Sequence, residues 1–109
     1  MTGAREQSVV RASRKVLHAA GAFVCKPDSR ALKGVPDDCA TFRGRSLWLE
    51  YKRPTGGVLT PMQRHRGEQI MAAGGIWLVV TDAQQVRDAL AAIDLEIDQA
   101  GRGKEAACK

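Results

Sequence analysis

The apolar residues of this chain recur at helical spacing in three stretches and at strand spacing between them. The first helix is expected from about residue 7 to residue 20, with a basic outer side, and Gly21 ends it. The second helix is expected to begin with Thr60 as N-cap, Pro61 as first residue and Gln63 in the capping-box position. These signals predict two helices separated by about forty residues of other structure.

Four apolar segments fill the intervals between the helices. Residues 22–25 form a short candidate strand, and residues 37–42 and 47–52 flank a turn, which predicts a hairpin. Residues 76–80 are continuously apolar, as expected for a strand that is buried on both faces and parallel to a neighbour. The expected fold class is therefore α/β, a small mixed sheet with a hairpin and one parallel strand, flanked by helices in the order α-β-β-β-α-β-α.

A third helix is expected after Thr81 or Asp82, either of which is suited to cap it, and its apolar stripe reaches Ile97. The last residues have no periodic pattern. We therefore expect a single domain over residues 1–97 and a disordered tail over residues 98–109.

Composition narrows the class of protein. A chain of 109 residues with 44% hydrophobic and 27% charged residues is typical of one small globular domain. The formal charge of +5 and the pI near 9.5 favour a polyanionic partner such as nucleic acid. The absence of a signal-peptide core, of an apolar run of about 20 residues and of Cys-x-x-Cys spacing predicts a cytoplasmic protein with reduced thiols.

The hairpin turn decides which acidic residues meet. A two-residue type II′ turn at Gly44 and Arg45 places Asp37 on the same face as Glu50 and diagonally from it. A four-residue loop keeps this parity, whereas a three-residue loop sets Asp38 opposite Glu50. Turn chemistry favours Asp37.

The strand over residues 47–52 carries charge where its neighbours are apolar. Trp48, Glu50 and Lys52 leave one face of it together. Asp37 and Glu50 are suited to hold a hard divalent cation, with Lys52 near a phosphate oxygen or an attacking water. Alternatively, Asp37 is a turn residue, and Glu50 with Lys52 is a solvent-facing charge pair. Burial of both strand faces weighs against the latter, since an unpaired buried charge costs several kcal/mol.

Two further polar residues allow two interpretations each. Glu6 is either a first-turn carboxylate favoured by the helix dipole or an acid that reaches the site. Gln63 is either the capping-box residue, which spacing favours, or a residue that positions water or metal.

Taken together, the segments Gly34–Asp37 and Glu50–Lys52, Gln63 after a Thr-Pro helix start, and Glu6 on the first helix resemble the VRR-NUC branch of the PD-(D/E)xK nuclease superfamily. The resemblance extends to about Leu90. It implies a restriction-endonuclease-like core and hydrolysis of phosphodiester bonds in DNA.

The resemblance also implies roles for individual residues. Asp37, Glu50 and the backbone carbonyl of Tyr51 would bind Mg²⁺ or Mn²⁺, and Lys52 would orient or deprotonate the attacking water. The resemblance also favours Asp37, rather than Asp38, as the aspartate that shares a face with Glu50.

By the same resemblance, Glu6 would hold a second metal or a metal-bound water, and Gln63 would steady Lys52 or the phosphate. One departure is visible, because Asp38 and Cys39 follow the motif aspartate where family members usually carry apolar residues. An extra carboxylate there is expected to repel substrate or to alter metal occupancy.

The expected partner is DNA, held through backbone phosphates rather than base edges. Small stand-alone relatives suggest a homodimer that acts on branched DNA such as a Holliday junction. The alternatives are a catalytically silent DNA-binding module and a partner-binding α/β protein without a nucleic-acid role. The candidate phosphate contacts are Arg11, Arg14, Lys15, Lys33, Arg53, Arg64 and Arg66.

Overall fold

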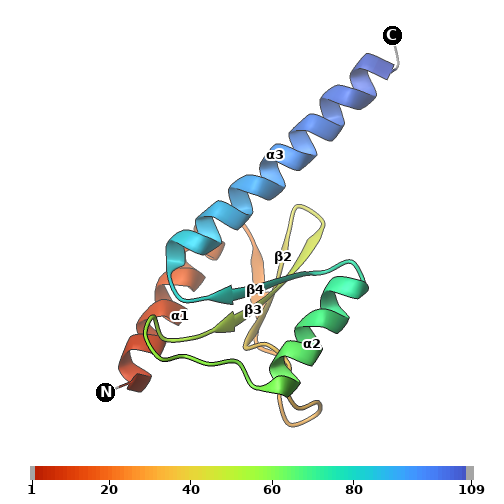
Figure 1. The fold of residues 1–109 in the computed structure, drawn as a ribbon. Helices are drawn as coiled ribbons and strands as arrows, with labels where there is room; N and C mark the ends of the chain where they lie inside the picture. Colours follow the sequence, from red (N-terminus) through yellow and green to blue (C-terminus); the bar gives the residue numbers. More distant parts are fainter. Residues whose placement is uncertain (1, 108–109) are drawn as a thin grey trace.

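The computed structural model describes the backbone of residues 2–107 and the side chains of residues 5–102. Its elements follow the predicted order α-β-β-β-α-β-α (Figure 1). They are α1 (Thr2–Ala19), β1 (Phe23–Cys25), β2 (Asp38–Phe42), β3 (Arg45–Tyr51), α2 (Pro61–Ala72), β4 (Ile76–Val80) and α3 (Ala83–Ala107).

The four strands form one mixed sheet in the order β1-β2-β3-β4. The two pairs that include β2 are antiparallel, and β3 pairs with β4 in parallel. A parallel pair needs a crossover, and α2 supplies it between β3 and β4. The predicted α/β class, with a hairpin plus a parallel strand flanked by helices, is confirmed, and it is a restriction-endonuclease-like arrangement.

One face of the sheet carries the hydrophobic core. Leu47, Leu49 and Tyr51 alternate inward from β3 and are almost completely buried. They pack with apolar residues of α1 and α3, the two helices that lie together on this face, as Figure 1 shows. The amphipathic stripes predicted for these helices therefore meet each other and the sheet.

The opposite face is covered only in part. There α2 packs on β4, where Gly67 allows the helix backbone to approach the ring of Trp77. The half formed by β1 and β2 is more open, and Phe23 of β1 is 71% exposed. Glu50 and Lys52 lie on this same face, at the border between the covered and the open half.

The predicted type II′ turn at Gly44 and Arg45 is wrong. Phe42 pairs with Arg45, so the two turn residues are Arg43 and Gly44, with φ angles of 49° and 81°. Positive φ at both positions is the type I′ pattern, whose twist matches that of paired strands. The change moves the register by two residues and keeps the parity, so the residue opposite Glu50 becomes Asp37.

The prediction that residues 76–80 are buried on both faces is also wrong, although their parallel pairing is confirmed. β4 lies at the edge of the sheet described for residues 2–107, beside β3, and Val79 is 37% exposed. A continuous apolar run does not distinguish a central strand from an edge strand that lies between helices.

The chain from residue 98 differs from the expected disordered tail, because α3 continues as a helix to Ala107 (Figure 1). The packed first turns nucleate the helix, and each further residue then adds one hydrogen bond. Arg43 and Arg45 of the hairpin also pair with Asp94 and Glu96 of α3 at 2.6 and 3.0 Å. Residues 108–109 lie outside the described part of the chain. Within that part, no helix is long and apolar enough to cross a membrane.

The contact between Gly67 and Trp77 gives a test of the packing of α2. A Cβ atom at Gly67 would lie 2.2 Å from Trp77 ring atoms, so we expect Gly67→Ala to destabilise the protein by about 1–3 kcal/mol. Gly101 of α3 has nothing within 4 Å of the same position, so Gly101→Ala is the control and should raise stability slightly. Urea unfolding measures both, and equal effects would contradict this account of the packing.

Candidate active site

Two carboxylates meet where β2 begins beside β3. Continuing the β2–β3 register by one step sets Asp37 directly opposite Glu50. Asp37 Oδ2 accepts a hydrogen bond from the backbone N–H of Tyr51 at 2.8 Å, which fixes its side chain against β3. Glu50 is only 2% exposed, so its charge has lost most of its hydration.

Electrostatics at this pair favour an added cation. Burial, and then the hydrogen-bonded Asp37 carboxyl, raise the pKa of Glu50 to about 9, while Lys52 acts to lower it. Ion pairs elsewhere in the described chain involve Asp28, Asp38 and acidic residues of α3, but neither Asp37 nor Glu50 forms one. The pair is therefore an acidic cluster without a matching basic partner in contact.

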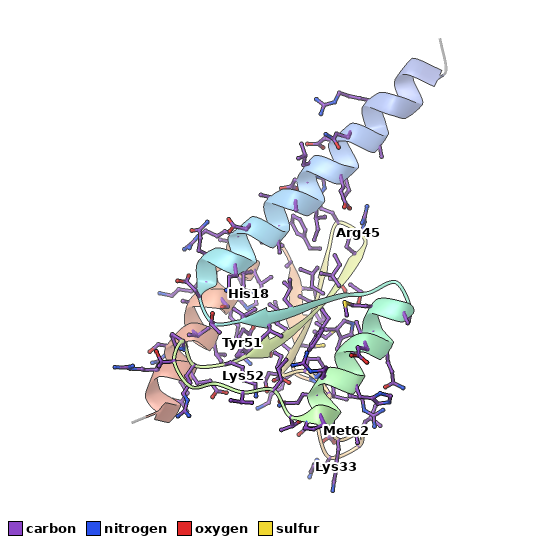
Figure 2. All side chains as sticks on the ribbon, in the orientation of Figure 1. His18, Lys33, Arg45, Tyr51, Lys52 and Met62 are labelled. Atoms are coloured by element: carbon purple, nitrogen blue, oxygen red, sulfur yellow. The ribbon has the colours of Figure 1, made fainter. Side chains whose placement is uncertain are left out.

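Lys52, which is labelled in Figure 2, follows Glu50 on the same face, and a residue of α2 holds its side chain. Its Nζ donates to Gln63 Oε1 at 3.0 Å, and the same oxygen accepts from the backbone N–H of Thr60 at 2.9 Å. The Thr60 hydroxyl accepts from the Gln63 N–H, which completes the predicted capping box. The two interpretations of Gln63 therefore do not exclude each other, because one oxygen caps the helix and contacts the lysine.

Asp38 does not lie beside the carboxylate pair. It is 0% exposed and points to the core face, where Arg14 Nε and Nη2 donate to its two oxygens at 2.8 Å. The Tyr51 hydroxyl donates to it as well, at 2.7 Å. Arg14 and Tyr51 hold the pKa of Asp38 below its usual range although burial alone would raise it. The expectation that this carboxylate disturbs substrate or metal is therefore not supported by its position.

Glu6 lies on the site side of α1, well inside the helix rather than in its first turn. Its carboxylate adds to the raised pKa of Glu50. Together with Asp37 it lines a cavity of about 370 Å³, whose basic residues include Arg11 and Lys26. Sequence reasoning missed Lys26, although its place at the end of β1, next to β2, was a usable signal.

The predicted phosphate contacts fall into two groups. Arg14 is bound to Asp38, and Arg66 donates to the Lys33 carbonyl at 2.9 Å, so both have structural partners. Arg53 donates to the Gly56 carbonyl at 3.2 Å within its own loop. The side chains that remain exposed to solvent are Arg11, Lys15, Lys33 and Arg64. Lys15 lies away from the carboxylates, in the groove between α1 and α3.

The oxygen donors of the candidate site match the needs of some divalent metal ions better than those of others. In the described residues there is no group of three or more His, Cys, Asp or Glu side chains that could hold a metal ion. Mg²⁺ needs fewer protein ligands, since it keeps several waters and is commonly bound by one or two carboxylates plus phosphate oxygens. Asp37 and Glu50, as adjacent oxygen donors without a basic partner in contact, fit such an ion.

With this geometry defined, comparison with solved structures identifies the fold. A solved chain described as a VRR_NUC domain superposes with a TM-score of 0.71 at 24% sequence identity, covering 80% of this chain and 95% of that one. No protein-family model and no curated protein matches the sequence. The chain has the fold of a VRR-NUC domain, as the resemblance of its motifs predicted.

The buried pair of Arg14 and Asp38 can be tested by removing one partner. We expect Arg14→Met to destabilise the protein by about 2 kcal/mol, less than for a fully buried pair because Arg14 is partly exposed. Arg43→Met is the control and should change stability much less, because Arg43 is about as exposed as Arg14 but its partner Asp94 is 47% exposed, whereas Asp38 is only 1% exposed. Thermal unfolding of both variants checks this, and a larger loss for Arg43→Met would contradict it.

Proposed function

We propose that this protein is a divalent-metal-dependent DNA endonuclease that hydrolyses phosphodiester bonds. The observation that carries the proposal is the convergence of Asp37 and Glu50 on one face, next to Lys52 held by Gln63. The fold of a VRR-NUC domain supports the same reading. Glu50 is buried, and in the described residues neither Glu50 nor Asp37 forms an ion pair, which argues against the alternative that these acids form a structural ion-pair network.

Each side chain has a role in this chemistry. Asp37, Glu50 and the Tyr51 carbonyl would hold Mg²⁺ or Mn²⁺, which when bound acidifies water and stabilises charge on phosphoryl oxygens. Lys52, anchored through Gln63, orients or deprotonates the attacking water and adds positive charge near the scissile phosphate.

Glu6 contributes from the other side, where its carboxylate faces the cavity shared with Asp37. There it would hold a second metal or a metal-bound water. Arg11 and Lys26, which line the same cavity, are suited to contact the phosphates that flank the cut. With a net charge of +5, the protein would bind DNA more weakly as salt rises.

The preferred substrate is proposed to be branched DNA, such as a Holliday junction, cut by a homodimer. This part rests on the resemblance to small stand-alone VRR-NUC proteins. Two active sites related by a two-fold axis match a junction whose arms have the same symmetry. An activity on cellular DNA would place the protein in the cytoplasm of a bacterial or phage-infected cell.

The first test is a cleavage assay on labelled four-way junction, flap and linear duplex with Mg²⁺, Mn²⁺ or EDTA. We expect metal-dependent cutting of the junction, and a fall of at least about 100-fold in Asp37→Asn and Glu50→Gln. Glu96→Gln, which neutralises an exposed glutamate of α3, is the control and should retain activity.

Three results would redirect the proposal. Cutting that persists in both site variants removes the assigned site. Equal cutting of every substrate removes the branched-DNA part alone. Salt-sensitive binding without metal-dependent nicking would instead favour a silent DNA-binding module.

A second test separates the two roles of Gln63. Thr60→Ala removes only the hydroxyl cap, so it should cost about 1 kcal/mol of stability and leave cleavage intact. Gln63→Ala also frees the Lys52 amine, so we expect an additional fall in cleavage rate of about 10- to 100-fold. Urea unfolding and single-turnover cleavage compare the pair, and equal rates would show that Gln63 acts only as a cap.

A further inference from the structure

An apolar cavity of about 430 Å³ lies between the loop before β2, the strand β3 and the helix α2. Nearly all of its exposed lining is apolar, and the polar residues that contribute to it are Asp28, Arg66 and Gln69. We call it the Trp48 pocket, and its apolar wall includes Leu32, Val35, Pro36, Trp48, Ile70 and Ala73.

The Trp48 pocket adjoins the carboxylate pair. Pro36 immediately precedes Asp37 in the chain, and Trp48 leaves β3 on the same face as Glu50. Two residues along a strand span about 7 Å, so the pocket opens within one nucleotide or two of the proposed cutting position. The pocket is therefore within reach of a DNA strand held at the carboxylates.

Several contacts hold the loop, the helix and the indole that line the pocket in place. Arg66 Nε donates to the Lys33 carbonyl at 2.9 Å, which ties the loop to α2. Gly34, with φ of 82°, lies so close to Met62 that a Cβ atom there would be 2.6 Å from its side chain. Figure 2 shows Lys33 and Met62 at this same end of the molecule. The indole of Trp48 is held in turn by a 2.8 Å bond to the Ser46 hydroxyl.

The chemistry of the pocket fits a flat heteroaromatic ring. Its volume lies in the range of small-ligand sites, and an indole offers a face on which any base can stack. Arg66 and Gln69, bonded to each other at 2.9 Å, add a guanidinium and an amide to the lining, and these groups are suited to contact the edge of a base. We propose that the Trp48 pocket takes one unstacked nucleobase of the strand that is cut, an inference that rests on the proposed function.

This assignment defines the substrate class. A base inside an intact duplex must unpair and unstack before it can enter, whereas an unpaired nucleotide enters at much lower cost. Among branched DNAs, the pocket therefore favours those with an unpaired nucleotide beside the cut, as occurs at flaps and imperfect junctions. Selectivity of this kind comes from one protomer and requires no dimer symmetry.

The test compares a single-stranded oligonucleotide with one of the same length and phosphates whose central nucleotides are abasic. Binding is measured in EDTA by fluorescence anisotropy and tryptophan emission, and cleavage is measured with Mn²⁺. We expect the normal strand to bind about tenfold more tightly and to quench tryptophan emission. Trp77→Phe should keep the quenching, whereas Trp48→Leu should lose both the quenching and the preference.

A second pair of variants avoids any change in the sheet. Ala73→Trp fills the pocket from the exposed end of α2 and should abolish the preference for the normal strand. Ala72→Trp, one residue away and outside the pocket lining, should keep it.

The outcomes separate the two proposals. Equal affinity for both strands, unchanged by Trp48→Leu and Ala73→Trp while metal-dependent cleavage persists, overturns the pocket and leaves the nuclease. No DNA binding and no metal-dependent cleavage by the unmodified protein overturns the proposed function, and with it the pocket.

Discussion

The side chains of two adjacent aspartates at the start of β2 point to opposite faces of the sheet, and the candidate site depends on that alternation. Asp37 turns to the face of Glu50 and is fixed by the Tyr51 N–H, while Asp38 turns to the core and is bound by Arg14 and the Tyr51 hydroxyl. Tyr51 thus holds both carboxylates, one through its backbone and one through its ring. A slip of one residue in the β2–β3 register would exchange the two aspartates.

The same alternation separates the face of the sheet that carries the hydrophobic core from the face that carries the candidate site. The core that α1 and α3 form with the sheet lies wholly on the side of Asp38. The carboxylate pair, the lysine and the Trp48 pocket lie on the other side, which α2 covers only in part. The hydrophobic core on one face of the sheet supplies most of the folding stability. The protein is therefore able to bear the free-energy cost of burying Glu50 on the other face.

The first turn of α2 contacts the lysine of the candidate site. Gln63 Oε1 caps the helix and contacts the Lys52 amine, so the start of the helix and the position of the lysine depend on one atom. The loop before β2 is fastened to the same helix through Arg66 and the Lys33 carbonyl. The helix therefore holds the lysine and the wall of the Trp48 pocket in one arrangement.

Local patterns in the sequence determined the element order, the capping box at Thr60 and the sharing of one face by Trp48, Glu50 and Lys52. These follow from helical and strand periodicity and from turn chemistry, which act over a few residues. The sequence also indicated that Asp37, rather than Asp38, lies on the face of Glu50, because two-residue and four-residue hairpin loops both place it there. It misjudged which residues form the turn, since an arginine at positive φ is not a recognisable signal.

Only the tertiary structure decided how distant side chains are paired. It bound Arg14, one of the expected phosphate contacts, to Asp38 across 24 positions of sequence, which gives the second aspartate a structural role. It brought Lys26 to the cavity beside Asp37, and it formed an apolar pocket from a loop, a strand and a helix. Such pairings depend on register and packing between elements far apart in the chain, and no local pattern encodes them.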